Sequence, residues 1–102
     1  MNRKQFVEQI LLPRLKEIES TLSLKADEYA TDGSAFYNFE RSAEISRTEP
    51  KTELWGMAKK HLVSIIDMVE SDKQHRHNYI EEKIGDMICY LILLEGLLKE
   101  GK

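Results

Sequence analysis

Two acidic residues in the C-terminal third of the chain have a spacing suited to metal binding. Glu82 and Asp86 are four residues apart, so on a helix both project from one face. The stretch that follows, Met87 to Leu94, is apolar on every side of such a helix. Both carboxylates are therefore expected to lie at the edge of a buried surface. Unpaired carboxylates are costly there, and a divalent cation with oxygen ligands, most commonly Mg²⁺, would compensate them. The alternative is that both are solvated surface acids.

A second acidic pair lies on an earlier amphipathic segment. Asp67 and Glu70 are three residues apart and point in related directions on a helix. Two acid-bearing helices packed antiparallel would place these groups and the Glu82–Asp86 pair around one metal ion, as in metal sites inside helical bundles. Lys60 lies on the same side as Asp67, where it could meet a phosphate group. Its alternative is an ordinary solvated lysine.

His61 is the third candidate for chemistry. It projects into the middle of an apolar stripe that includes Ala58, Leu62 and Ile65. A histidine in that position is either a core residue with satisfied hydrogen bonds or a catalytic base.

The hydrophobic pattern predicts three helices that position these residues, over about 14–29, 50–71 and 79–99. Apolar residues recur every three or four positions in each segment, and Thr48-Glu49-Pro50 is a helix-start signal. Pro13 would interrupt the first helix, so the residues before it are expected to form a turn or short segment. The aromatic segment 30–49 is predicted to be an ordered loop or a short helix. With no period-two run, the sequence predicts an all-α bundle of three to four helices, one domain over residues 1–102.

Composition excludes several classes of partner. Lys and Arg number 15 against 18 Asp and Glu, a formal charge of -3, so no basic field is available to hold duplex nucleic acid. Cys89 is the single cysteine, which rules out an intrachain disulfide and fits a reducing cytoplasm. The longest apolar run is far shorter than the roughly 20 residues of a membrane-spanning helix. Neither secretion nor a membrane partner is expected.

The acidic segment resembles a known motif. Glu81-Glu82-Lys83-Ile84-Gly85-Asp86-Met87-Ile88 is similar to the metal helix of the MazG-like all-α nucleoside triphosphate pyrophosphohydrolases, in which Glu-Glu-Leu-Gly-Asp followed by apolar residues is typical. Lys25-Ala-Asp-Glu-Tyr29, Phe36-Tyr-Asn-Phe39 and Lys60-His61 precede it in the order of small phage and prophage relatives of the nucleotide-modification-associated helical domain. The resemblance covers most of the chain from Lys25 onward.

The resemblance implies a homodimer or homotetramer of helical subunits in the cytoplasm, that of the host if the chain is phage-encoded. It also implies a Mg²⁺ or Mn²⁺ site fed by two helices and hydrolysis of a nucleotide to a monophosphate and pyrophosphate. Carried over by position, it assigns metal binding to Asp67, Glu70, Glu82 and Asp86, and catalysis to Lys60 and His61. It assigns the nucleotide pocket to Lys25, Tyr29, Phe36 and Asn38. The alternative for the pocket residues is packing and turn formation.

One departure from the family pattern bears on activity. Lys83 stands where the family's second motif, Glu-x-x-Asp, has its glutamate, so Glu82 would act from one residue earlier. The counterpart of the first motif, Glu-x-x-Glu, is Asp67-x-x-Glu70. A lysine beside the ligands would partly neutralise a metal site. It favours a second hypothesis, a non-catalytic phage accessory protein that binds a host or phage protein through a helical face.

Overall fold

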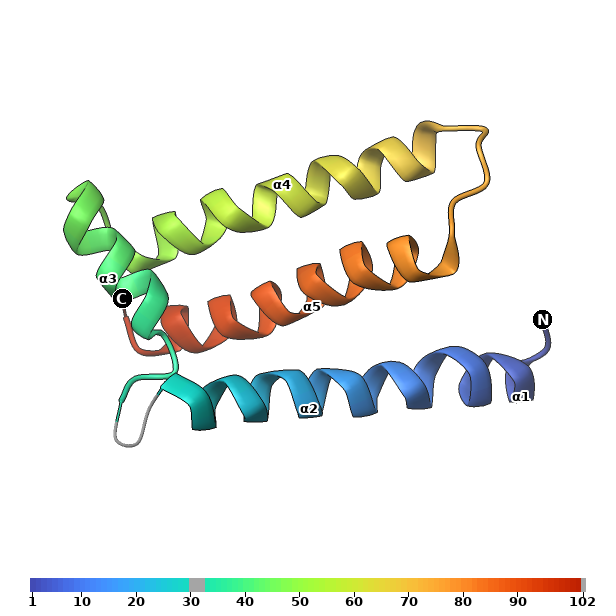
Figure 1. The fold of residues 1–102 in the computed structure, drawn as a ribbon, viewed down its shortest axis with the longest axis horizontal. Coiled ribbons are helices and arrows are strands. Elements are labelled where there is room, and N and C mark those ends of the chain that lie inside the picture. Colours follow the sequence, from blue (N-terminus) through green and yellow to red (C-terminus); the bar gives the residue numbers. More distant parts are fainter. Residues whose placement is uncertain (30–32, 102) are drawn as a thin grey trace. The chain divides into compact units, whose positions relative to one another are not determined.

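The computed structural model describes the backbone of residues 1–29 and 33–101, and side chains in 1–23 and 33–101. In these ranges the chain is helical and contains no strand, which confirms the all-α class (Figure 1). The chain divides into two compact units, Met1–Ala35 and Phe36–Lys102.

The first unit is a long run of helical backbone. It comprises α1 (Arg3–Phe6), a π-helical turn (Val7–Leu11) and α2 (Leu12–Tyr29). Asn2 caps its start: the Gln5 backbone N–H donates to Asn2 Oδ1 at 2.8 Å, and the Asn2 N–H donates to Gln5 Oε1 at 3.0 Å. This reciprocal cap satisfies two amides that a helix start leaves open. The helix therefore begins at Arg3, well before the position near residue 14 that the sequence predicts.

Pro13 explains why this helical run contains a π turn. Proline cannot donate a backbone hydrogen bond, and its ring crowds the carbonyl four residues earlier. The backbone widens immediately before it, where the Leu12 N–H donates to the Val7 carbonyl, five residues back. A π turn of this kind lets a helix pass a local obstruction without ending. The residues before Pro13 therefore continue the helix.

The second unit holds α3 (Tyr37–Ser46), α4 (Pro50–Glu70) and α5 (His77–Lys99). α4 and α5 form an antiparallel hairpin, and α3 lies across the end where α4 begins and α5 ends (Figure 1). Pro50 occupies the first turn of α4, where a missing N–H costs nothing. α5 begins two residues earlier than the sequence predicts, and the aromatic segment contributes the short helix α3.

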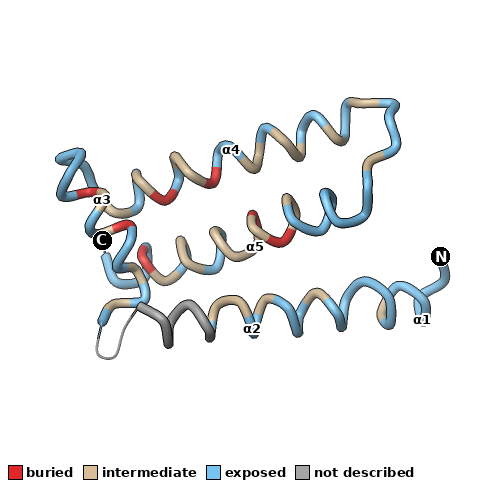
Figure 2. Tube along the Cα trace, viewed as in Figure 1, coloured by how far each residue is buried: buried red, intermediate tan, exposed pale blue. Residues whose placement is uncertain are grey.

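The core of this unit lies where α3 meets the hairpin. Leu54, Ala58 and Leu97 are fully buried, and Phe39 and Met87 are nearly so (Figure 2). Phe36, Met57, Leu62, Ile65, Tyr90, Leu93 and Leu94 pack against them. Phe39 anchors α3, because its ring meets Tyr90 of α5 edge to face with centroids 6.4 Å apart. This packing holds α3 and the hairpin together.

A close contact at Gly96 gives a testable pair of substitutions. A Cβ at Gly96 would lie 2.7 Å from Phe36 Cζ, whereas one at Gly56 would meet no atom within 4 Å. Displacing a packed ring costs about 1–3 kcal/mol, and alanine restores about 0.5–1 kcal/mol of helix propensity at either position. We expect Gly96→Ala to lower the free energy of unfolding by about 1 kcal/mol and Gly56→Ala to raise it by about 0.5–1 kcal/mol. Urea unfolding measures both, and equal responses would contradict the contact.

A carboxylate ties α3 and the turn after it to α4. Ser42 Oγ and Thr48 Oγ1 each donate to Glu53, both at 2.6 Å. These hydrogen bonds, that of Ser42 first, hold the pKa of the Glu53 carboxyl below its ordinary value of 4.5. A lowered folded-state pKa contributes stability that is present above 4.5 and is lost as the pH falls through the folded value. Glu53 thus stabilises the position of α3 at neutral pH.

We therefore expect Glu53→Gln to flatten the acid limb of the stability profile. Wild type loses stability as the pH falls below 4.5, and part of that loss belongs to Glu53. Thermal melts from pH 7 to pH 3 on both proteins measure the difference, with Glu8→Gln as the matched control in the other unit. Parallel profiles for wild type and Glu53→Gln would show that these hydrogen bonds do not contribute to the pH dependence of stability.

Candidate functional site

The hairpin brings His61 of α4 opposite Asp86 of α5. His61 Nδ1 lies 3.8 Å from Asp86 Oδ2, although the residues are 25 positions apart in the sequence. The histidine side chain is 18% exposed and the aspartate 48%, so the pair spans the boundary between core and solvent. Asp86 is thus at the edge of the core, as the sequence predicts, and its position there is set by α4.

Tyr90 completes this cluster. It lies one turn after Asp86 on α5, and its ring centroid is 5.3 Å from that of His61 with the planes tilted by 41°. Burial, and then the negative charge of Asp86, raises the pKa of the Tyr90 hydroxyl above its ordinary value of 10.0. The hydroxyl therefore stays protonated at neutral pH. The sequence pattern predicts no role for Tyr90, although its spacing of four residues from Asp86 is a signal that could identify it.

The imidazole of His61 has an unusual polar atom. Its Nδ1 is buried and has no hydrogen-bond partner in the part of the chain that the structure describes. The 3.8 Å to Asp86 is too long for a hydrogen bond. A buried nitrogen left in that state costs about 1–3 kcal/mol. Asp86 is the charged group that faces this nitrogen, and the role of His61, as a core residue or as a catalytic base, stays a prediction.

The remaining predicted ligands lie nearer the hairpin loop. Asp67, Glu70 and Glu82 are exposed, as is Lys60. A helix rises about 1.5 Å per residue, so Asp67 lies about 9 Å closer to the hairpin loop than His61 does. Glu82 lies about 6 Å closer to the loop than Asp86 does. Asp67 and Glu82 are therefore at nearly the same level along the hairpin axis. Within residues 1–23 and 33–101, no group of three or more histidine, cysteine or acidic side chains is placed to hold a metal ion. One chain therefore offers the Glu82–Asp86 pair but no four-carboxylate cluster.

The predicted nucleotide-pocket residues fall in different places. Lys25 and Tyr29 lie outside the residues whose side chains the structure describes. Phe36 is half-buried, packs against the core and covers Gly96, which is the packing alternative for this residue. Asn38 is exposed on α3. Phe36 contacts the protein core and Gly96. Stacking of its ring on a nucleotide base stays a prediction.

Lys83, the departure from the family pattern, is held beside Glu82. Its Nζ lies 4.0 Å from Glu82 Oε1 and 5.5 Å from the centroid of the Tyr79 ring. His75, in the loop between α4 and α5, stacks on the Tyr79 ring, and the two ring centroids are 5.8 Å apart. A cation over an aromatic face is stabilised electrostatically. Lys83 therefore offsets part of the Glu82 charge.

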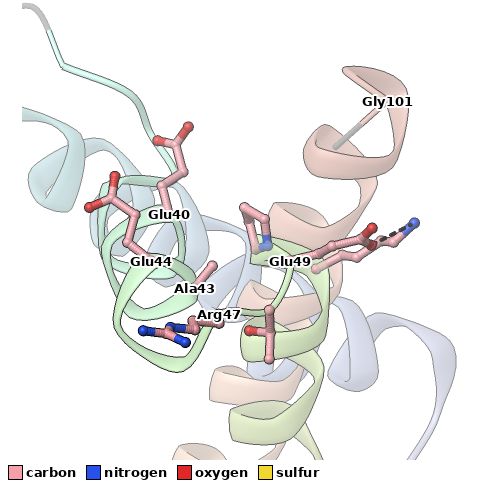
Figure 3. A pocket seen from close by; sticks show the side chains of 9 residues that line it. Glu40, Ala43, Glu44, Arg47, Glu49 and Gly101 are labelled. Atoms are coloured by element: carbon pink, nitrogen blue, oxygen red, sulfur yellow. Dashed lines mark ion pairs between the residues drawn. The ribbon is translucent and has the colours of Figure 1, made fainter.

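A separate pocket of about 550 Å³ opens beside α3 and the start of α4 (Figure 3). Glu40, Glu44 and Glu49 give it acidic walls, and Arg47 and Lys51 add positive charge. Lys51 Nζ pairs with Glu49 Oε2 at 3.4 Å. None of the residues predicted to bind metal or nucleotide lines this pocket. Its mixed charge and side chains point to no specific ligand.

Comparisons of the chain with models of known protein families, with curated proteins and with solved structures found no match. Fold and site therefore define the class directly: an all-α protein whose helical hairpin carries a histidine–aspartate–tyrosine cluster at the edge of its core. In the described ranges, no helix combines the length and apolar character needed to cross a bilayer.

Proposed function

We propose that this chain binds a nucleoside triphosphate through a divalent cation at the Glu82–Asp86 edge of the hairpin and hydrolyses it to a monophosphate and pyrophosphate. The observation that carries the proposal is the placement of Asp86, half-exposed at the core edge and facing the buried Nδ1 of His61. Mg²⁺ is commonly held by one or two carboxylates together with phosphate oxygens and water. Two carboxylates from the chain therefore suffice.

The residues around this edge have distinct roles in the proposal. Asp86 and Glu82 hold the cation, which when bound polarises phosphate oxygens and activates a water molecule. Asp67 lies at nearly the same level along the hairpin as Glu82, and Glu70 lies about one turn closer to the loop. Asp67 and Glu70 are therefore the additional candidate ligands. Lys60 offsets negative charge that develops on the phosphates. Tyr90, packed on His61, keeps the imidazole oriented toward Asp86.

The proposal includes a homodimer or homotetramer in a reducing cytoplasm, that of the host if the chain is phage-encoded. Its support is the apolar surface of the hairpin, because Ile66 of α4 and Leu91 and Ile92 of α5 are each more than 40% exposed. Exposed side chains of this kind are covered when helical subunits associate. Sedimentation at micromolar concentration measures the oligomeric state.

The test is pyrophosphate release from a panel of common and modified nucleoside triphosphates with Mg²⁺ or Mn²⁺. We expect turnover in wild type and in Asp72→Asn, an exposed loop acid that serves as the matched control, and none in Asp86→Asn. Turnover that survives Asp86→Asn would overturn the site. If wild type releases no pyrophosphate from any nucleotide of the panel, the proposed hydrolysis is wrong.

A specific observation favours a second candidate, a non-catalytic accessory protein that binds a host or phage protein through a helical face. Val63, Ile66 and Val69 recur at every third position of α4 and are 58%, 43% and 80% exposed. A divalent cation with nucleotide raises the melting temperature only if a site exists, because a ligand of the folded state stabilises by mass action. No shift at millimolar Mg²⁺ or Mn²⁺ with nucleotide would favour the accessory protein over the enzyme.

A further inference from the structure

We infer that His61 is itself a ligand of the cation, through Nδ1, and that the site therefore prefers a transition-metal ion to Mg²⁺. The inference rests on the proposed function for the location of the site and goes beyond it in the ligand set and the metal. Its starting point is one arrangement, a buried imidazole nitrogen without a hydrogen-bond partner in the described residues, facing a half-exposed carboxylate at 3.8 Å.

The distance fits two ligands of one ion better than it fits a direct hydrogen bond. A metal–ligand bond to imidazole nitrogen or carboxylate oxygen is about 2.1 Å, so two ligands of a tetrahedral ion are roughly 3.4 Å apart. The observed 3.8 Å between Nδ1 and Oδ2 is within a few tenths of an ångström of that span. It exceeds the range of a hydrogen bond between nitrogen and oxygen. A small rotation of the Asp86 side chain brings both atoms onto one ion.

The surroundings suit such a site. The Nδ1 atom is already desolvated, whereas the Asp86 side chain is 48% exposed to solvent. The Tyr90 ring packs on the imidazole and restricts its orientation, as supporting residues do around metal-binding histidines. His61 and Asp86 are the two protein ligands of the ion, and water or phosphate oxygens complete the coordination.

A nitrogen ligand changes which ion is bound. Mg²⁺ takes oxygen ligands almost entirely, whereas imidazole suits Zn²⁺, Co²⁺ and Ni²⁺. Affinity for sites with nitrogen and oxygen ligands rises from Mn²⁺ through Co²⁺ to Ni²⁺. The wild-type chain is therefore expected to bind Co²⁺ and Zn²⁺ more tightly than Mn²⁺, and Mn²⁺ more tightly than Mg²⁺.

The test is calorimetric titration of the full chain with Co²⁺, Zn²⁺, Mn²⁺ and Mg²⁺ in the absence of nucleotide, with the visible absorption of Co²⁺ as a second readout. We expect His61→Gln to lower Co²⁺ and Zn²⁺ affinity by about tenfold or more and to change Mg²⁺ affinity little. Asp86→Asn should weaken all four ions. His77→Gln, an exposed histidine on the same hairpin, is the matched control and should leave the affinities and the spectrum unchanged.

Co²⁺ affinity and spectrum unchanged in His61→Gln would overturn the inference, and the proposed function would still stand if nucleotide hydrolysis with Mg²⁺ depends on Asp86. Conversely, Co²⁺ binding that needs His61, in a protein inactive on every nucleotide, supports the inference and removes the proposed function. If His61→Gln does not fold, Zn²⁺ titration of ¹⁵N-labelled wild type decides. A shift of the His61 Nδ1 resonance supports ligation, and an unmoved resonance overturns it.

Discussion

Leu54→Ala is expected to lower the free energy of unfolding by about 3 kcal/mol, within the 2–5 kcal/mol that buried leucine truncations cost. Leu54 is 0% exposed at the junction of α3, α4 and α5, so the removed atoms lose their contacts and leave a cavity. A domain of this size has only about 5–15 kcal/mol of net stability. The substitution therefore removes a large part of it, and the melting temperature should fall by roughly 10–20 °C.

The matched control for this prediction is Val63→Ala on the same helix. Val63 is 58% exposed, so its truncation removes few contacts and should change stability by about 0.5 kcal/mol or less. Urea unfolding of both variants at one protein concentration measures the contrast. A Leu54→Ala loss no larger than that of Val63→Ala would contradict the position of the core. A large loss for Val63→Ala that depends on protein concentration would instead show that the exposed α4 face is covered by a second copy.

Asp86→Asn is expected to abolish stabilisation by nucleotide with a divalent cation while leaving the fold intact. The amide has the size of the carboxylate and the side chain is 48% exposed, so the packing of α5 is unchanged. The amide carries no charge and is a poor ligand for a hard cation. Under the proposed function, wild type is expected to gain about 2.7 kcal/mol at a nucleotide concentration one hundred times Kd, and this gain should vanish in the variant. Thermal melts with and without Mg²⁺ or Mn²⁺ and nucleotide measure it.

Tyr90 supplies an independent readout of the same substitution. The charge of Asp86 is the second cause, after burial, that raises the pKa of the Tyr90 hydroxyl. Removing the charge should therefore lower that pKa toward, but not to, its ordinary value of 10.0, because burial remains. Absorbance of the tyrosinate from pH 8 to pH 12 follows the change, with Asp72→Asn as the control. A Tyr90 titration that does not respond to Asp86→Asn would place the carboxylate elsewhere than the structure does.

Local patterns in the sequence predict the helices of this protein. The apolar residues of 50–71 and 79–99 recur at helical spacing, and Thr48-Glu49-Pro50 marks a start, so backbone preference and amphipathic pattern agree. The structure has α4 and α5 in nearly these ranges. Where local signals compete, the prediction is weaker. Pro13 argues for a break, and only the π turn at Val7–Leu11 shows how the helix continues past it.

The candidate site depends on tertiary structure in a different way. Sequence spacing alone placed Glu82 and Asp86 on one helix face, since two residues four apart on a helix are neighbours whatever the rest of the chain does. It could not place His61 against Asp86, because that contact depends on the register between α4 and α5. The loop after α4 and the interlocking of side chains from both helices set this register. Only the packed hairpin decided that a buried imidazole nitrogen would face that carboxylate.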